Sequence, residues 1–156
     1  MIDKTELKPT LKNIPWLMDL SVEQINSLEK IAGVRYLDCG EVLFHEGDND
    51  NVLYIVSEGR LAVEILVPGH GQVCIYFAEP LDLVGWDRMT PVARQRITSI
   101  TATQKSFLIY MDAAVVSELC ESDPKIGMVI MRRLSNVIAS RLLSMRIKLL
   151  ELLAEQ

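Results

Sequence analysis

The sequence has few cysteines, no long apolar run and no apolar leader, and each absence excludes a class of protein. The three cysteines, Cys39, Cys74 and Cys120, are widely spaced and odd in number, which argues against a disulfide framework and against a zinc site of paired cysteines. The N-terminal residues MIDKTELKPT are polar and contain no secretory h-region. The apolar runs are too short to span a bilayer. We therefore expect no membrane segment and a reducing, cytoplasmic compartment.

The signatures of enzymes and of metal or haem proteins are also missing. The sequence has no Walker loop, no ordered Ser-His-acid set and no paired histidines, so we expect no enzyme, no catalytic residue and no metal ligand. The only two histidines, His45 and His70, lie in expected turns, away from any cysteine at a ligand spacing. A haem or redox sensor is therefore an alternative without a motif to support it.

The composition indicates one globular domain over residues 1–156. Hydrophobic residues make up 49% of the chain and charged residues 24%, a balance that allows a sizeable buried core. The net charge of −5 is uneven, because residues 1–123 carry 10 basic and 19 acidic side chains, whereas residues 124–156 carry 6 and 2. An acidic body of this kind is a poor electrostatic platform for nucleic acid.

Residues 1–33 are expected to form a helical lead-in. Ser21 and Gln24 have the spacing of a capping box at the start of a helix, and Gly33 is expected to close that helix. Apolar residues recur between them at helical spacing, namely Ile25, Leu28 and Ile31.

Residues 34–111 have the texture of short strands. Runs rich in Val, Ile, Leu, Tyr and Phe alternate with turn residues, and helical periodicity is missing. About seven or eight strands at this spacing predict a sandwich or barrel. Gly47 and Gly59 stand at two of the expected strand reversals, where a positive φ is often required.

Residues 112–156 return to a helical pattern. Asp112 is a candidate N-cap for a short helix, and Asp123 with Pro124 suits the start of a long one. The long segment carries a heptad seam in which seven of eight positions are apolar, namely Met128, Met131, Ser135, Ile138, Leu142, Met145, Leu149 and Leu152. We predict a homodimer through residues 128–152; the alternative is that the seam folds back on its own domain.

A basic loop connects two of the expected strands. Leu83 and Val84 can end a strand, and the β-branched run ITSITAT begins another. Between them lie Gly85, Pro91 and three arginines, Arg88, Arg94 and Arg96. Loop amides and guanidinium groups bind phosphate or carboxylate oxygens, so this loop is a candidate site for a small anion. The alternative is a solvated surface loop.

These features together resemble a known family. The helical lead-in, the run YLDCGEVLFHEGDNDNVLYIVSEGRLAVEI, the Gly85 segment and the final long helix are similar to the cyclic-nucleotide-binding domain, and more narrowly to the sensor half of catabolite-activator and FNR-type regulators. The resemblance covers about residues 11–150. It implies a mainly β fold with flanking helices: a β-roll (double-stranded β-helix, or jelly roll) with ligand held between the roll and the long helix.

The resemblance also implies a phosphate-binding cassette at residues 83–98. Gly85 and Arg96 match the glycine and arginine that hold the cyclic phosphate in the family. Trp86 stands where the family has a glutamate for the ribose hydroxyl, and an indole donates hydrogen bonds but does not accept them. Ile97 follows the arginine where a small hydroxyl residue is common, and Thr98 comes one position late.

The resemblance implies a regulatory domain that binds a small anionic effector, with cyclic AMP and cyclic GMP as candidates, and signals through the C-terminal helix to a protein partner. After the pair Arg141-Leu142, Ser144 and Arg146 are candidate contacts to a base. No helix-turn-helix follows, so we expect no direct DNA binding. The alternative is a ligand-free dimeric interaction module whose pocket is plugged by Trp86. The candidate ligand-binding residues are Gly85, Trp86, Asp87, Arg96, Ile97 and Thr98.

Overall fold

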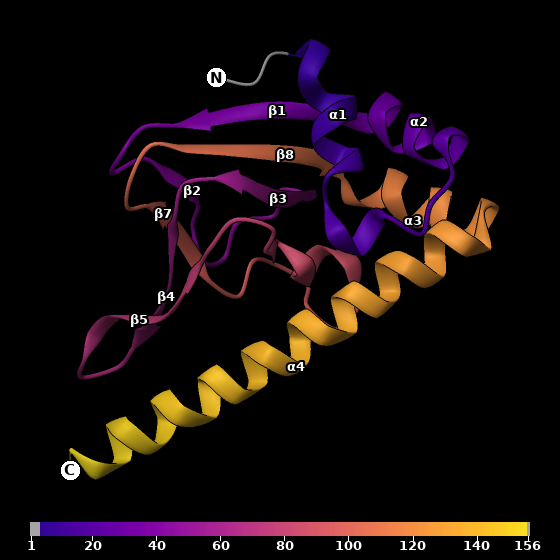
Figure 1. Ribbon diagram of the computed structural model, residues 1–156. Coiled ribbons are helices and arrows are strands. Elements are labelled where there is room, and N and C mark those ends of the chain that lie inside the picture. Colours follow the sequence, from indigo (N-terminus) through magenta and orange to yellow (C-terminus); the bar gives the residue numbers. More distant parts are fainter. Residues whose placement is uncertain (1–3, 156) are drawn as a thin grey trace.

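Eight strands form two four-stranded antiparallel sheets in the computed structural model, which describes residues 4–155 (Figure 1). The first sheet has the order β1-β8-β3-β6, with β1 at Ala32–Leu37, β8 at Ser106–Asp112, β3 at Val52–Glu58 and β6 at Leu83–Val84. The second has the order β2-β7-β4-β5, with β2 at Val42–Phe44, β7 at Ser99–Ala102, β4 at Leu61–Val67 and β5 at Gly71–Ala78. The predicted mainly β fold with flanking helices is confirmed.

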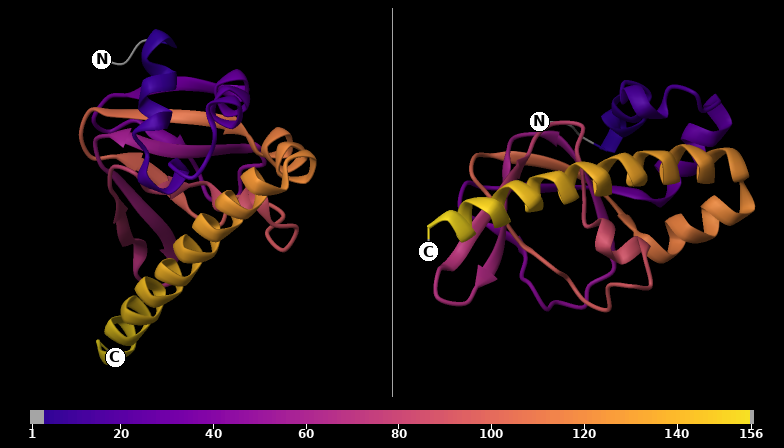
Figure 2. Two further views of the ribbon diagram at one scale, coloured as in Figure 1. Left: turned by 45° about the vertical axis from the view of Figure 1, so that its right-hand side comes forward. Right: turned by 90° about the horizontal axis from the view of Figure 1, so that it is seen from below.

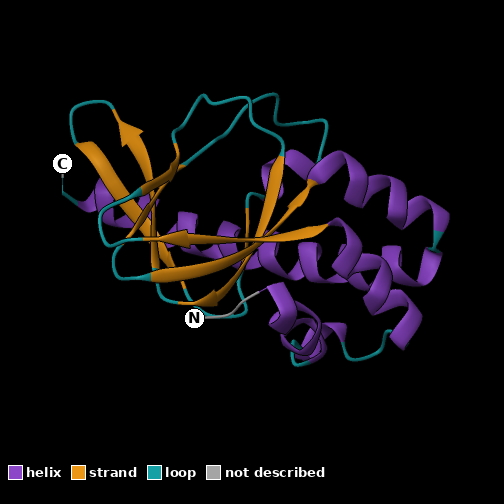
Figure 3. Cartoon of the chain, turned by 90° about the horizontal axis from the view of Figure 1, so that it is seen from above, coloured by secondary structure: helices purple, strands orange, loops and turns teal. Residues whose placement is uncertain are grey.

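Helices gather at one end of the sheets and along one side (Figure 3). The N-terminal elements are η1 (Lys4–Glu6), α1 (Leu7–Lys12), η2 (Pro15–Leu17) and α2 (Val22–Ile31). A short 3-10 helix, η3 (Trp86–Met89), follows β6, and the chain ends in α3 (Ala113–Ser122) and α4 (Pro124–Ala154). Figure 2 shows from below how α4 crosses the length of the molecule and ends beside the β4–β5 hairpin.

Most of the local signals correspond to real caps and turns. Ser21 and Gln24 form the predicted capping box at the start of α2, and Gly47 and Gly59 have φ values of +94° and +98°. The expectation for Gly33 is wrong, because α2 ends at Ile31 and Gly33 pairs with Tyr110 inside the first sheet. A glycine suits that position because a Cβ there would lie 2.3 Å from the Tyr110 ring.

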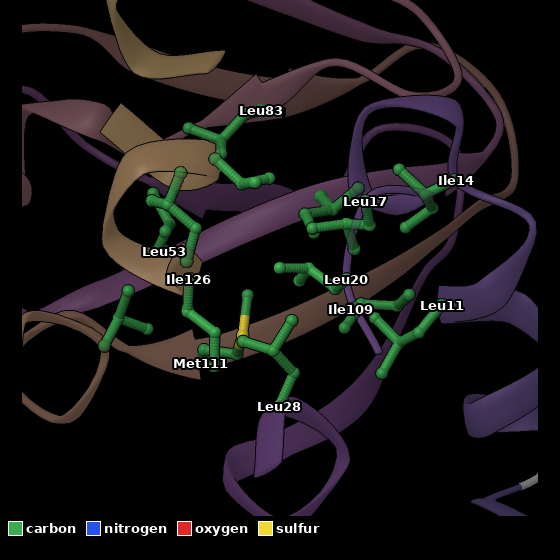
Figure 4. Close-up of a cluster of buried hydrophobic side chains, with 14 of the residues drawn as sticks. Leu11, Ile14, Leu17, Leu20, Leu28, Leu53, Leu83, Ile109, Met111 and Ile126 are labelled. Carbon is green, nitrogen blue, oxygen red and sulfur yellow. The ribbon is translucent and has the colours of Figure 1, made fainter. Parts of the chain in front are cut away.

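The central strand β3 is buried on both faces because its residues alternate between two apolar clusters. In β3, Leu53 and Ile55 point toward the helices, whereas Tyr54 and Val56 point into the roll. This period of two is the normal alternation of a strand. The helical cluster joins side chains from α1, α2, β3, β6, β8 and α4 (Figure 4). The helical lead-in is therefore part of the core and supports the sheet that carries β6.

The two halves of α4 have different surroundings. Up to Val137 the helix buries one face against the domain. Beyond Val137, none of the described residues of α4 is buried, and much of the apolar seam is open to solvent, including Leu142 at 69% exposure and Leu149 at 56%. Within residues 4–155, no helix is long and apolar enough to cross a membrane.

Replacing Asp123 with alanine is expected to lower the free energy of unfolding by about 1–2 kcal/mol, since an N-cap is lost. The Asp123 side chain accepts hydrogen bonds from the Lys125 and Ile126 amides at 3.2 and 3.4 Å, and from the Gln24 amide group at 3.1 Å. Urea denaturation monitored by circular dichroism measures the change. Glu121→Ala, at an exposed site just before the cap, is the control, and equal losses in the two variants would contradict the capping role.

Candidate functional site

A cavity of about 350 Å³ lies between the second sheet, the β6–β7 loop and α4. The sheet contributes four side chains, Ile65, Ile75, Tyr76 and Ile100. The loop contributes Gly85, Trp86, Asp87, Ile97 and Thr98, and α4 contributes Ile138, Arg141, Leu142 and Met145. The size is typical of a small-molecule site, and a largely apolar lining with a few polar groups is typical too.

Gly85 shapes the entrance of the loop into the cavity wall. It has a φ of +81° between β6 and η3, in the left-handed region that favours glycine. A Cβ at this position would lie 2.8 Å from the Val52 carbonyl oxygen and 2.9 Å from a terminal nitrogen of Arg96. The glycine thus lets the loop turn directly over the Arg96 guanidinium.

The Arg96 guanidinium is fully buried, and protein groups accept hydrogen bonds from all of its nitrogens. Nε donates to Asp50 Oδ1 at 3.0 Å, and one terminal nitrogen donates to the other Asp50 oxygen and to the Val52 carbonyl at 2.6 Å. The second terminal nitrogen donates to Asp87 Oδ1 at 2.8 Å and to the Gly85 carbonyl at 3.2 Å. A guanidinium has five N–H groups, so these five hydrogen bonds leave none for a ligand.

Two carboxylates therefore surround one guanidinium at the inner end of the cavity. Asp87 is 3% exposed, and its second oxygen accepts a hydrogen bond from the Ile97 amide at 3.0 Å. Burial acts to lower the pKa of Arg96, but the hydrogen bonds and charges of Asp50 and Asp87 outweigh it and raise that pKa. The formal charge of this inner group is −1.

A second charged group lies at the outer edge of the cavity, where α4 passes the roll. The Arg141 guanidinium stacks 3.6 Å above the centre of the Tyr76 ring and lies 3.3 Å from Asp82 Oδ2. Arg133, two turns earlier on α4, lies 3.8 Å from the other oxygen of Asp82. Burial raises the pKa of Tyr76 to about 12, so its hydroxyl is protonated at neutral pH. Two guanidinium groups share one carboxylate here, which leaves a formal charge of +1.

The structure brings together five of the six predicted ligand-binding residues. Gly85, Trp86, Asp87, Ile97 and Thr98 all line the cavity. The expectation for Arg96 differs from the structure, because this side chain lies beneath the cavity wall and is held by the two carboxylates.

The predicted basic loop does not gather its charges at the cavity. Arg94 is exposed, and neither Arg94 nor Arg88 lines the cavity. Ser144 and Arg146, the expected base contacts on the long helix, also lie outside it. Sequence reasoning missed Tyr76 and the isoleucines of the second sheet, whose only signal is the inward side of an alternating strand.

Trp86 forms a wall of the cavity and does not fill it. A second hollow of about 500 Å³ lies on its other side and is lined by Met89, Met131, Leu134 and Ser135 among others. Trp86 and Ile138 line both spaces. In the described part of the chain, Trp86 therefore does not plug the cavity as the alternative prediction required. Its indole lies between the cavity and the hollow next to the exposed seam.

Residues 34–123, more than half of the chain, match the sequence model of the cyclic nucleotide-binding domain. The chain belongs to the cyclic nucleotide-binding domain family. This family supplies regulatory domains, and the matched residues contain the strands and the Gly85 loop. The predicted resemblance is thus confirmed.

Solved structures share the fold of this cyclic nucleotide-binding domain. A cyclic nucleotide-binding domain from Methylobacillus flagellatus has a TM-score of 0.77 at 19% identity, over 95% of this chain and 83% of that one. The N-terminal domain of a transcriptional regulator from Streptomyces coelicolor has a TM-score of 0.67 at 22% identity, over 87% of this chain and 94% of that one.

Among curated proteins, an uncharacterized NTE family protein of Mycobacterium bovis is 25% identical over 136 residues. The match covers 86% of this chain but only 22% of that protein. The domain therefore spans about a fifth of the length of this relative.

Among the described residues, no three His, Cys, Asp or Glu side chains come together as a metal-binding group. His45 and His70 are exposed and lie outside the strands, as expected.

Proposed function

We propose that this domain is a ligand-sensing regulatory module that binds a small effector in the cavity and signals through α4. The proposal is supported by the make-up of the cavity wall, which two separate elements form together. The β6–β7 loop provides one side and four residues of α4 provide the other, namely Ile138, Arg141, Leu142 and Met145. A ligand held there contacts both elements, so its binding energy depends on how α4 sits against the roll.

The output of the module is proposed to be a homodimer whose two copies of α4 meet along the seam. The seam residues Met131, Ile138, Leu142 and Leu149 are between 40% and 69% exposed in the single chain. Exposed apolar side chains at heptad spacing are the usual surface of a helical dimer. Ile138, Leu142 and Met145 belong to the seam and to the cavity wall at once, which links effector binding to dimer geometry. A protein partner would bind one arrangement of the two α4 helices in preference to the other.

Cyclic AMP and cyclic GMP are the first effectors to test, because they are the ligand class of the family. The Gly85 loop, at the family's cassette position, lines the cavity. A cyclic phosphate that used Arg96 would first have to displace Asp50 or Asp87 from the guanidinium. Binding of the effector is proposed to be reversible, without chemical change.

Hydrogen exchange tests the proposed sensing. Cyclic AMP, cyclic GMP and decanoate, an amphipathic anion chosen because the cavity lining is largely apolar, are added separately to the whole chain. The exchange of amides in residues 134–150 is followed by mass spectrometry. At least one probe is expected to slow this exchange and to raise the melting temperature, by the linkage between binding and stability. Three silent probes would contradict the proposed function.

The control for this experiment is a variant whose cavity is filled. Thr98→Phe places a ring inside the cavity wall and is expected to abolish the response. Val92→Phe adds the same ring in the same loop at a site that is 88% exposed and outside the cavity, and it is expected to respond as the natural chain does.

A further inference from the structure

The charges around the cavity do not suit a ligand whose anionic group binds at the Gly85 loop. The net charge is negative beside that loop and positive beside α4. The inner end, beneath Gly85, has two carboxylates for one guanidinium. The outer edge, on α4, has two guanidinium groups for one carboxylate, Asp82. An anion is therefore repelled at the inner end and attracted at the outer edge, and at short range in a partly buried site such differences are large.

Arg141 is the candidate anchor at the outer edge, although it already contacts Asp82 and the Tyr76 ring. Its side chain is 13% exposed, and its Nε atom is buried without a hydrogen-bond partner in the described part of the chain. Buried donors without a partner are uncommon in folded proteins; Arg88 and Arg133 have them too, but of these three arginines only Arg141 lines the cavity. The carboxylate that faces Arg141, Asp82, also accepts a hydrogen bond from the Glu79 amide at 2.9 Å and lies near Arg133. Arg141 therefore retains N–H groups that can donate hydrogen bonds to an acidic ligand.

The space between the two ends is apolar. Five isoleucines from three strands of the second sheet, the loop and α4 surround it, together with Leu142, Met145 and the ring of Trp86. Such a wall favours hydrocarbon or aromatic surface, because that surface is removed from water on binding. It offers few partners for the hydroxyl groups of a sugar, which would lose hydrogen bonds to water on entering.

We propose that the cavity takes an amphipathic carboxylate rather than a cyclic nucleotide. The carboxylate binds the Arg141 guanidinium at the outer edge, and the apolar body extends inward between the isoleucines toward Gly85. Arg96 stays with Asp50 and Asp87 and has no contact with the ligand. This assignment rests on the proposed function, since it names the ligand class of the same cavity.

The test uses decanoate as the probe and decanamide as its uncharged counterpart. Binding to the whole chain is measured through Trp86 fluorescence in a Trp16→Phe background, because Trp86 lines the cavity and Trp16 does not. Arg141→Gln is expected to weaken decanoate binding about ten-fold to a hundred-fold, the range for a hydrogen bond to a charged group. Decanamide binding is expected to change little.

Arg146→Gln is the matched control, because it removes the same charge from an exposed site on the same helix outside the cavity. It is expected to leave decanoate binding within about two-fold of the natural chain, since exposed charges are screened. Equal weakening by Arg141→Gln and Arg146→Gln would overturn the assignment of the anchor.

Competition with nucleotides separates this inference from the proposed function. Displacement of decanoate by cyclic AMP or cyclic GMP, or their tight binding without decanoate, overturns the ligand class but leaves a ligand-sensing domain. Silence of Trp86 toward decanoate and both nucleotides overturns both. Binding of decanoate that depends on Arg141, with no response to the nucleotides, supports both.

Discussion

Replacing Arg96 with leucine is expected to lower the free energy of unfolding by about 3–5 kcal/mol, because the change breaks a buried ion-pair network from one side. Asp87, which is 3% exposed, would remain beside the half-buried Asp50 without the guanidinium that neutralises them. The carbonyl groups of Val52 and Gly85 would lose a donor as well. Chemical denaturation at neutral pH, with the midpoint and slope fitted together, measures the loss.

Arg94→Leu is the control for this prediction, because Arg94 lies two residues away and is exposed. It is expected to change stability by less than about 0.5 kcal/mol, as surface substitutions usually do. Adding Asp50→Asn and Asp87→Asn to Arg96→Leu removes the unpaired charges and is expected to recover a large part of the loss. A mild effect of Arg96→Leu alone would mean that Arg96 is not the structural centre of the loop.

Replacing Leu142 with aspartate is expected to convert the proposed dimer into monomers. Leu142 is 69% exposed in the single chain and occupies the middle of the distal seam. A buried leucine contributes about 1.5–3 kcal/mol, and a two-fold interface contains it twice. The dissociation constant is therefore expected to rise at least about 100-fold. Sedimentation velocity over a range of protein concentrations measures it.

Leu66→Asp provides the comparison for the seam variant. Leu66 is 60% exposed on the β4–β5 hairpin and outside the seam, so its replacement is expected to leave the dimer intact. Circular dichroism of both variants separates dissociation from unfolding. A natural chain that sediments as a monomer at every concentration would reject the dimer and leave the cavity unaffected.

Local signals in the sequence account for most of the elements. The capping box at Ser21, the caps at Asp112 and Asp123, and the turn glycines Gly47 and Gly59 each depend on residues within about four positions of one another. The short-range physics of caps and turns is sufficient to predict these features. Gly33 was misassigned because its reason is the Tyr110 ring, 77 positions further along the chain.

The charge state of the site could not be predicted in the same way. The sequence does not show that the Arg96 guanidinium has partners. In the structure it donates hydrogen bonds to Asp50, 46 residues earlier, and to Asp87, 9 residues earlier. A resemblance transfers the position of a side chain but not its partners. The apolar wall is likewise invisible until β4, β5 and β7 are paired.

The double role of α4 has a consequence for any measurement of affinity. Ile138, Leu142 and Met145 lie both in the cavity wall and on the exposed seam. In the proposed dimer, the free energy of ligand binding and the free energy of dimer formation would therefore not be independent. Thermodynamic reciprocity then requires that each event alter the equilibrium constant of the other by the same factor. In the proposed dimer, the apparent affinity of the effector would therefore depend on the protein's own concentration, so that dilution would itself regulate binding.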